Sequence, residues 1–156
     1  INSAAVFKPR LIKEASDSFG CQCIVLAIDA YKDQSNFKSG YNVSTHGGKK
    51  KTNIDALEWA IQGEKNGAGE ILLTSMNADW TKLGYDIELT SKISNNLSIP
   101  VIASGGAGKP MDMVNALNKG GASAVLAASI FHFGIYSIEN VKKEMLKYNI
   151  PTRKTW

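Results

Sequence analysis

The sequence predicts an α/β fold built around a parallel β-sheet. Short apolar runs alternate with stretches in which apolar residues recur at helical spacing. The period is roughly 30 to 50 residues, which is typical of βαβ units. Several of the apolar runs are almost uninterrupted, as expected for strands covered on both faces. Small or polar residues follow every run, at the strand ends where α/β sheets bind their ligands.

The composition favours one globular domain. The chain has 156 residues, of which 44% are hydrophobic and 21% charged, and this length is sufficient for a substantial core. The net charge is +4 and most lysines are scattered, so we expect a phosphorylated small molecule as ligand and no nucleic acid. The sequence contains no signal segment and no apolar run of about 18 residues, so we expect no membrane contact and a cytoplasmic location.

The hydrophobic pattern places the elements in order along the chain. Strands are predicted for the following apolar runs, of which the first is only the end of a strand: 1–5, 21–30, 70–75, 101–104 and 124–128. Helical spacing predicts helices at 9–19, 54–67, 87–93, 110–119 and 137–148. Between them, residues 31–52 form a long polar connection in which a short hairpin is possible. We find no linker, so residues 1–156 are predicted to form a single domain.

The cysteines and histidines do not predict a metal site. Cys21 and Cys23 are two residues apart at the start of a predicted strand, where we expect two buried thiols on one face. Such neighbours are poor disulfide partners. With His46 and His132 as the only further soft ligands, no ligand set of recognised spacing can be assembled. We therefore expect neither a metal ion nor a cofactor.

A glycine-rich turn is the first candidate for a ligand site. The segment Ser104-Gly105-Gly106-Ala107-Gly108 lies between a predicted strand and a helix that opens at Pro110. Glycines let backbone N–H groups approach a ligand, and the start of a helix adds the positive end of its dipole. The turn therefore predicts a phosphate site, although the same glycines would also serve a tight strand-to-helix connection.

Carboxylates and hydroxyls follow the other strands. Asp29 comes after an apolar run, so we expect it to be partly buried. Partial burial would raise its pKa and suit it to acid/base chemistry. Alternatively, Asp29 caps the following loop by accepting hydrogen bonds from backbone amides. Asp79 lies in a polar loop, where it either binds a ligand hydroxyl or forms a turn. Asp86 is expected to cap the following helix. Ser129 either donates to a phosphate or caps a short turn. Thr74 and Ser75 end the strand before the Asp79 loop.

Six segments that span essentially the whole chain carry a resemblance to a known family: Gln22-Cys23-Ile24-Val25-Leu26-Ala27-Ile28-Asp29-Ala30, Thr45-His46-Gly47-Gly48-Lys49, Gly67-Ala68-Gly69-Glu70-Ile71-Leu72-Leu73-Thr74-Ser75-Met76, Gly84-Tyr85-Asp86, Ile102-Ala103-Ser104-Gly105-Gly106 and Leu126-Ala127-Ala128-Ser129-Ile130-Phe131-His132-Phe133-Gly134. In these segments the chain resembles the cyclase subunit of imidazole glycerol phosphate synthase, from histidine biosynthesis.

The resemblance implies half of a TIM (β/α)8 barrel. The family has eight βα units in roughly 250 residues, within the usual size of this fold. Residues 1–5 match the end of its fourth strand, and the four complete strands match the fifth to the eighth. The chain is thus expected to be a C-terminal half-barrel, (βα)4, with a parallel sheet.

The resemblance also assigns roles to residues. Asp29 matches a catalytic aspartate that acts as general acid, and Asp79 matches an aspartate that contacts substrate. The phosphate site of this half is matched by Ser104, Gly105, Gly106, Ala128 and Ser129. Asn2 and Ser3 match part of a second phosphate site, and Thr74 and Ser75 match the strand end that leads to the substrate loop.

The family's reaction closes a ring. It joins a ribulosyl intermediate to ammonia, giving imidazole glycerol phosphate and aminoimidazole carboxamide ribotide without a metal or redox cofactor, and the ammonia comes from a glutaminase partner. The second catalytic aspartate lies on the family's first strand, which this chain does not match. We therefore expect phosphate binding but little activity from the chain alone. It is expected to pair with an N-terminal half-barrel or with itself, and a non-catalytic, self-associating scaffold is the alternative.

The loop after Ser75 departs from the family pattern. The family loop reads Met-Asp-x-Asp-Gly-Thr-Lys, whereas this chain has Met76-Asn77-Ala78-Asp79-Trp80-Thr81-Lys82. Asn77 removes a charge. Trp80 replaces a glycine next to the ligand, so its indole is expected to crowd the site or to change the path of the loop.

Overall fold

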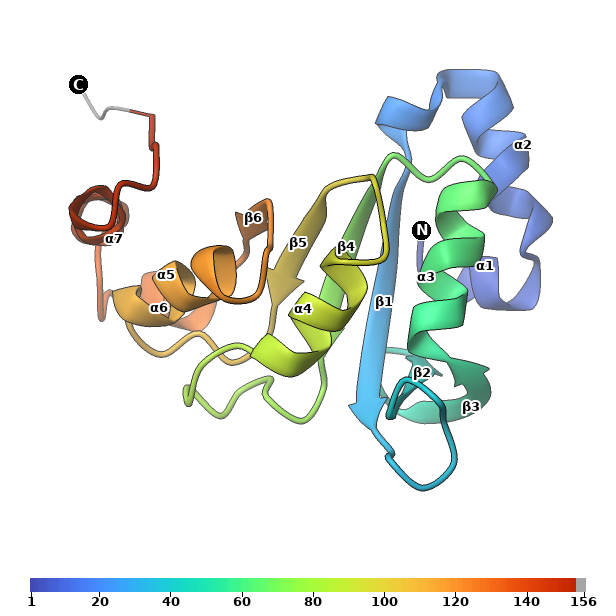
Figure 1. The fold of residues 1–156 in the computed structure, drawn as a ribbon, viewed down its shortest axis with the longest axis horizontal. Coiled ribbons are helices and arrows are strands. Elements are labelled where there is room, and N and C mark those ends of the chain that lie inside the picture. The colour runs from blue at the N-terminus through green and yellow to red at the C-terminus, as the bar shows by residue number, and fades with distance from the viewer. Residues whose placement is uncertain (154–156) are drawn as a thin grey trace.

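A mainly parallel sheet organises the chain (Figure 1). The computed structural model describes residues 1–153, so the end of the predicted domain at residue 156 lies outside the described residues. In this part of the chain the strands are β1 (Val25–Lys32), β2 (Tyr41–Thr45), β3 (Lys50–Asp55), β4 (Glu70–Ser75), β5 (Val101–Ser104) and β6 (Ala124–Val125). The strand order is β3-β2-β1-β4-β5-β6. The pairs β1–β4, β4–β5 and β5–β6 are parallel, which confirms the predicted α/β class.

The five predicted helices are all present, and the polar connection contains the hairpin that the sequence allowed. The α-helices are α1 (Ser3–Phe7), α2 (Arg10–Phe19), α3 (Ala56–Lys65), α4 (Ile87–Ser94), α5 (Pro110–Asn118), α6 (Ser129–His132) and α7 (Ile138–Lys147). Strands β2 and β3 form an antiparallel hairpin inside the polar connection, and β2 pairs with β1. The hairpin thus extends the parallel part of the sheet along its β1 edge.

Three strand predictions need correction at their ends. The strand end predicted at residues 1–5 is wrong from residue 3 onwards, because α1 begins at Ser3. The N-terminal amine and the carbonyl of Ile1 nevertheless form hydrogen bonds with the backbone of β1. A 3₁₀ turn, η1 (Cys21–Cys23), precedes β1, so the predicted buried thiols are in fact both exposed. The last strand ends at Val125, three residues earlier than predicted, and β6 has a partner on one side only.

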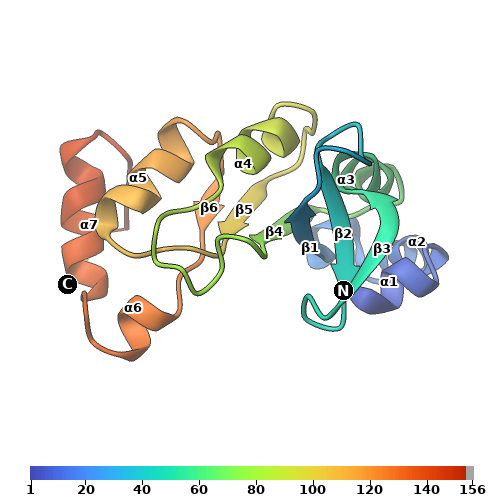
Figure 2. The same ribbon diagram turned by 90° about the horizontal axis from the view of Figure 1, so that it is seen from below.

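The sheet is covered by helices on one face. Along β1 and β4, fully buried side chains alternate with half-buried ones. The buried set, which includes Leu26, Ile28, Ile71 and Leu73, packs in a core with residues of α2, α3 and α4. Figure 2 shows α3, α4 and α5 along one side of the curved sheet. The prediction that both faces are covered is therefore wrong for the described residues, and we call the other face the inner face.

Helix starts follow from local sequence. Asp55 caps α3 by accepting hydrogen bonds from the amides of Leu57 and Glu58. Asp86 caps α4 through the amide of Leu89, as predicted. Pro110 occupies the first turn of α5, where its missing N–H costs nothing. These caps fix where each strand-to-helix loop ends.

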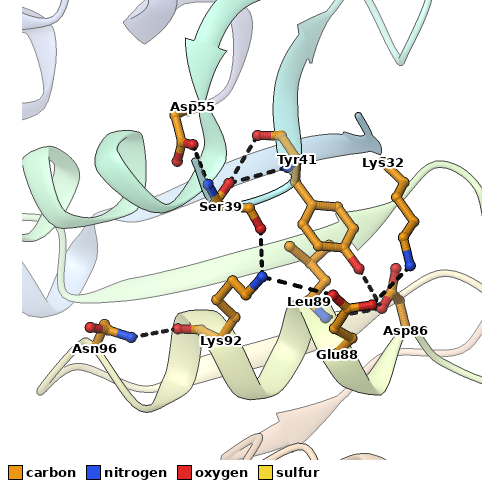
Figure 3. A network of polar contacts seen from close by, with 9 residues as sticks. All are labelled: Lys32, Ser39, Tyr41, Asp55, Asp86, Glu88, Leu89, Lys92 and Asn96. Carbon is orange, nitrogen blue, oxygen red and sulfur yellow. Dashed lines mark hydrogen bonds and ion pairs between the residues drawn. The ribbon is translucent and has the colours of Figure 1, made fainter. Parts of the chain in front are cut away.

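A polar network joins the hairpin to α4 (Figure 3). Asp86 accepts hydrogen bonds from the Tyr41 hydroxyl at 3.2 Å and from the Ser75 hydroxyl at 3.1 Å. Burial and the neighbouring carboxylates of Asp86 and Glu88 raise the pKa of Tyr41, so its hydroxyl stays a donor. Asp86 therefore connects β2, the end of β4 and the start of α4. Nearby, Lys92 of α4 donates to the carbonyl of Ser39 at 2.6 Å.

No helix among residues 1–153 has the length and apolar character needed to cross a membrane.

Replacing Asp86 with alanine should lower the free energy of unfolding by about 2 to 4 kcal/mol. The change removes a helix cap and leaves the hydroxyls of Tyr41 and Ser75 without an acceptor. Urea denaturation measures the loss. Ser137→Ala is the matched control, since Ser137 caps α7 through Asn140 alone and should cost about 1 kcal/mol. Equal losses in the two variants would show that the Tyr41 and Ser75 bonds contribute nothing.

Candidate functional site

A row of polar side chains crosses the inner face of the sheet at the carboxyl ends of its strands. Asp29 is paired in register with Thr74, and Thr74 is paired with Ser104. Paired residues of neighbouring strands project to the same face. All three are half-buried, unlike the side chains beneath the helices. On the same face, two residues earlier along β1, β4 and β5, the neighbouring row is apolar and consists of Ala27, Leu72, Ile102 and Ala124.

Asp29 lies at one end of this row in a half-buried position. Its Oδ2 atom accepts a hydrogen bond from Nδ2 of Asn2 at 3.0 Å. Burial raises the pKa of Asp29 above its usual value of 3.8, the Asn2 hydrogen bond opposes this, and the charge of Asp79 adds to the rise. A carboxyl group with a raised pKa is suited to giving and taking protons. The Oδ1 atom of Asn2 is buried and has no partner among the described residues, which leaves an acceptor free beside Asp29.

A pocket lies at the other end of the row. It brings together residues from the glycine turn, from the segment after β6 and from the loop after β4, and its lining consists of Asp79, Trp80, Lys82, Ser104, Gly105, Gly106, Ala107, Leu126, Ala127, Ala128 and Ser129. The five residues predicted for the phosphate site of this half therefore share one pocket. Asp79 lines it too and also acts on the pKa of Asp29, so both ends of the row belong to one connected region.

The pocket offers uncommitted backbone donors. Within the described residues, the amides of Gly105, Gly106 and Ser129 have no intramolecular acceptor. Backbone N–H groups that converge on a hollow form an anion-binding concavity. The Gly105 amide comes from the turn after β5, and the Ser129 amide comes from the segment after β6. Two neighbouring strand ends thus bring free amides to the lining of the same pocket.

The glycines also serve the packing of the turn. Gly105 and Gly106 have positive φ angles of 87° and 101°. A Cβ atom at Gly106 would collide with the carbonyl oxygen of Gly84, whose amide in turn donates to the Gly106 carbonyl at 2.8 Å. The tight-connection role is therefore present in the fold. It does not exclude anion binding, because the amides of Gly105 and Gly106 are not used in this packing.

The loop after β4 carries the two departures from the family pattern. The Asn77 side-chain oxygen accepts a hydrogen bond from the amide of Lys32 at 2.7 Å, and the Met76 amide donates to the carbonyl of Ala30. This end of the loop is thus fastened to β1, the strand of Asp29. Trp80 has a φ of 64°, a conformation that favours glycine. Its side chain is 79% exposed while it lines the pocket, so the indole lies at the pocket rim.

Some predicted residues lie away from the pocket. The hydroxyl of Ser75 is buried on the helix side and donates to Asp86. The hydroxyl of Ser3 accepts from the amide of His46, in the hairpin turn, so Asn2 and Ser3 lie on the β1 side of the row. His132 is exposed and makes an edge contact with the ring of Phe133. Sequence reasoning did not assign four of the pocket residues to the site, although they lie in segments that it singled out: Lys82, Ala107, Leu126 and Ala127.

In the described part of the chain, no group of three or more His, Cys, Asp or Glu side chains is placed to hold a metal ion. The site's chemistry therefore has to be derived from its carboxyl groups, hydroxyls and amides.

Replacing Asp29 with asparagine should raise the free energy of unfolding at pH 7. Because the folded state raises the pKa of Asp29, folding favours the protonated carboxyl, and stability falls as pH rises through the window above 3.8. The asparagine removes this penalty, so its advantage should shrink as pH falls towards 3.8 and should vanish below it, where the carboxyl is protonated in both states. Urea denaturation across this range measures the difference.

The matched control is Asp17→Asn, which alters an exposed carboxylate paired only with Lys13. Surface pairs of this kind contribute little, so this variant should follow the wild type at every pH. An unchanged pH profile for Asp29→Asn would contradict the raised pKa.

Comparisons with known proteins identify the family of the chain. The model of a family described as histidine biosynthesis protein matches residues 1–137. The chain is 56% and 57% identical over 153 residues to the imidazole glycerol phosphate synthase subunit HisF of two strains of Dehalococcoides mccartyi. Each match covers 98% of this chain and 59% of the relative, so the chain spans about three fifths of the length of these relatives. The chain belongs to the histidine biosynthesis protein family.

Proposed function

We propose that this chain is the C-terminal half-barrel of an imidazole glycerol phosphate synthase cyclase, and that it forms a single domain. The observation that carries the proposal is the polar row on the uncovered inner face, which runs from Asp29 to the amide-lined pocket. In a closed barrel the inner face is packed by side chains of the other strands. Half-buried Leu72 and Ile102 have no such neighbours among the described residues, as expected for half of a barrel.

The pocket is proposed to bind one phosphate of the substrate. The amides of Gly105, Gly106 and Ser129 would donate to its oxygens, and the hydroxyls of Ser104 and Ser129 would add further donors. Asn2 and Ser3, at the β1 side of the row, would contribute to a second phosphate site. A substrate with a phosphate at each end would then lie along the polar row.

Asp29 is proposed to act as the general acid in ring closure. Its raised pKa keeps a larger protonated fraction near neutral pH, and the hydrogen bond from Asn2 holds its carboxyl in place. Asp79, whose charge contributes to that raised pKa, would bind a substrate hydroxyl. A second aspartate from an N-terminal half would complete the acid/base pair, and ammonia would come from a glutaminase partner. The products would be imidazole glycerol phosphate and aminoimidazole carboxamide ribotide.

The proposal is tested by mixing this chain with the N-terminal half of a homologous cyclase and supplying ammonia as the nitrogen source. The chain alone should show little or no turnover, and the mixture should be active. Asp29→Asn should lower the activity of the mixture by at least about a hundredfold, since acid/base groups contribute 10² to 10⁴. Asp17→Asn should leave it unchanged. A co-purifying but inactive mixture, or full activity without the Asp29 carboxyl, would overturn the proposal.

A second candidate function is a non-catalytic scaffold that binds phosphate and associates with itself. The uncovered apolar row of the inner face favours it, because such a surface is unfavourable in water. A two-fold dimer that brings two inner faces together would bury it.

For the scaffold, light scattering at micromolar concentration should give the mass of a dimer. Leu72→Lys places a charge in the apolar row and should shift the chain to the monomer. Ile138→Lys adds the same charge on exposed α7 and should leave the dimer intact. A monodisperse wild-type monomer would rule out the scaffold reading.

A further inference from the structure

Lys82 is the cationic side chain of the glycine pocket. Among the residues that line the pocket, the ionisable side chains are Asp79 and Lys82. A phosphate held by the turn's amides would be repelled by the carboxylate of Asp79 unless a positive charge offsets it. Lys82 is placed to supply that charge.

The backbone at Lys82 is built into the glycine turn. Its φ is 58°, in the left-handed region, and a Cβ atom at Gly108 would collide with its carbonyl oxygen. Gly108 is the third glycine of the turn and does not line the pocket. Its absence of a side chain therefore allows residue 82 to lie against the turn, which fixes the point from which the lysine side chain extends.

The ammonium group of Lys82 is not engaged by a carboxylate. It forms none of the ion pairs of the described residues. Its Nζ atom lies 5.9 Å from the centre of the Phe133 ring, at the outer limit of a cation–π contact. Phe133 is itself exposed, so this contact is weak and can be exchanged for a stronger one.

From these observations we infer that Lys82 binds the phosphate of a phosphate monoester in this pocket, leaving the face of Phe133 when the anion arrives. The inference rests on the phosphate site of the proposed function and adds a ligand that the glycine pattern does not contain. A compact ammonium group acts on phosphate as a point charge. It needs no rigid planar set of donors, so a long, flexible side chain in the pocket lining can supply it.

Binding of inorganic phosphate to the full chain tests this inference. Titration followed by the amide NMR signals of Gly105, Gly106 and Ser129 gives both the affinity and the location of the anion. Lys82→Gln should weaken binding roughly tenfold, since one charge-assisted contact is lost, and should reduce the dependence of affinity on salt. Lys82→Arg keeps the charge and should retain most of the affinity.

Lys109→Gln is the matched control. Lys109 follows the same turn and is exposed, but it does not line the pocket. This variant should bind phosphate like the wild type.

The outcomes separate the inference from the function on which it rests. Wild-type binding with shifts at all three amides, unchanged in Lys82→Gln, would overturn the role of Lys82 and leave the phosphate site standing. Absence of any shift in the wild type would overturn both. Equal weakening in Lys82→Gln and Lys109→Gln would show a diffuse charge effect and would also overturn the specific role of Lys82.

Discussion

The parallel register of β1, β4 and β5 is the constraint from which the candidate site follows. Parallel pairing brings Asp29, Thr74 and Ser104 into one row although they are distant in the sequence. A shift of one residue in any of these strands would turn its polar side chain towards the helices. The neighbouring residue Ser75 shows this outcome, because it faces the helix layer and bonds to Asp86. The carboxyl ends of the strands thus carry two distinct polar systems, one on each face.

The sequence offers two explanations for the glycine turn, a phosphate site and a tight strand-to-helix connection, and the structure shows that they are compatible. A Cβ atom at Gly106 would collide with the carbonyl oxygen of Gly84, and one at Gly108 with that of Lys82. The turn therefore needs these two glycines even without a ligand. The same contacts hold the loop after β4 against the pocket. Packing therefore creates the place where the turn's free amides, Asp79 and Lys82 meet. Gly106 thus has a packing role of its own and at the same time lines the pocket.

Apolar runs and helical spacing made much of the fold predictable from the sequence. The order and type of the central elements agree with the pattern, and Asp86 caps its helix as expected. Strand limits were less predictable, since an apolar run does not reveal how many neighbours a strand has. Thus β6 stops at Val125, and Cys21 lies in a 3₁₀ turn although a strand was predicted to start there. Lys82 matches the lysine that ends the family loop, but its place at the pocket was not predictable, because it depends on a contact with Gly108 in another loop.

Trp80 gives this molecule an optical property that the family's glycine would not provide. Its indole is 79% exposed at the pocket rim, whereas Trp59 is 2% exposed in the core. An exposed indole emits at longer wavelength and is reached by quenchers dissolved in water, whereas a buried indole is shielded from them. The emission of Trp80 is therefore expected to be separable from that of Trp59. This departure from the family pattern thereby places an intrinsic fluorophore beside the pocket, where it would report occupancy without any chemical label.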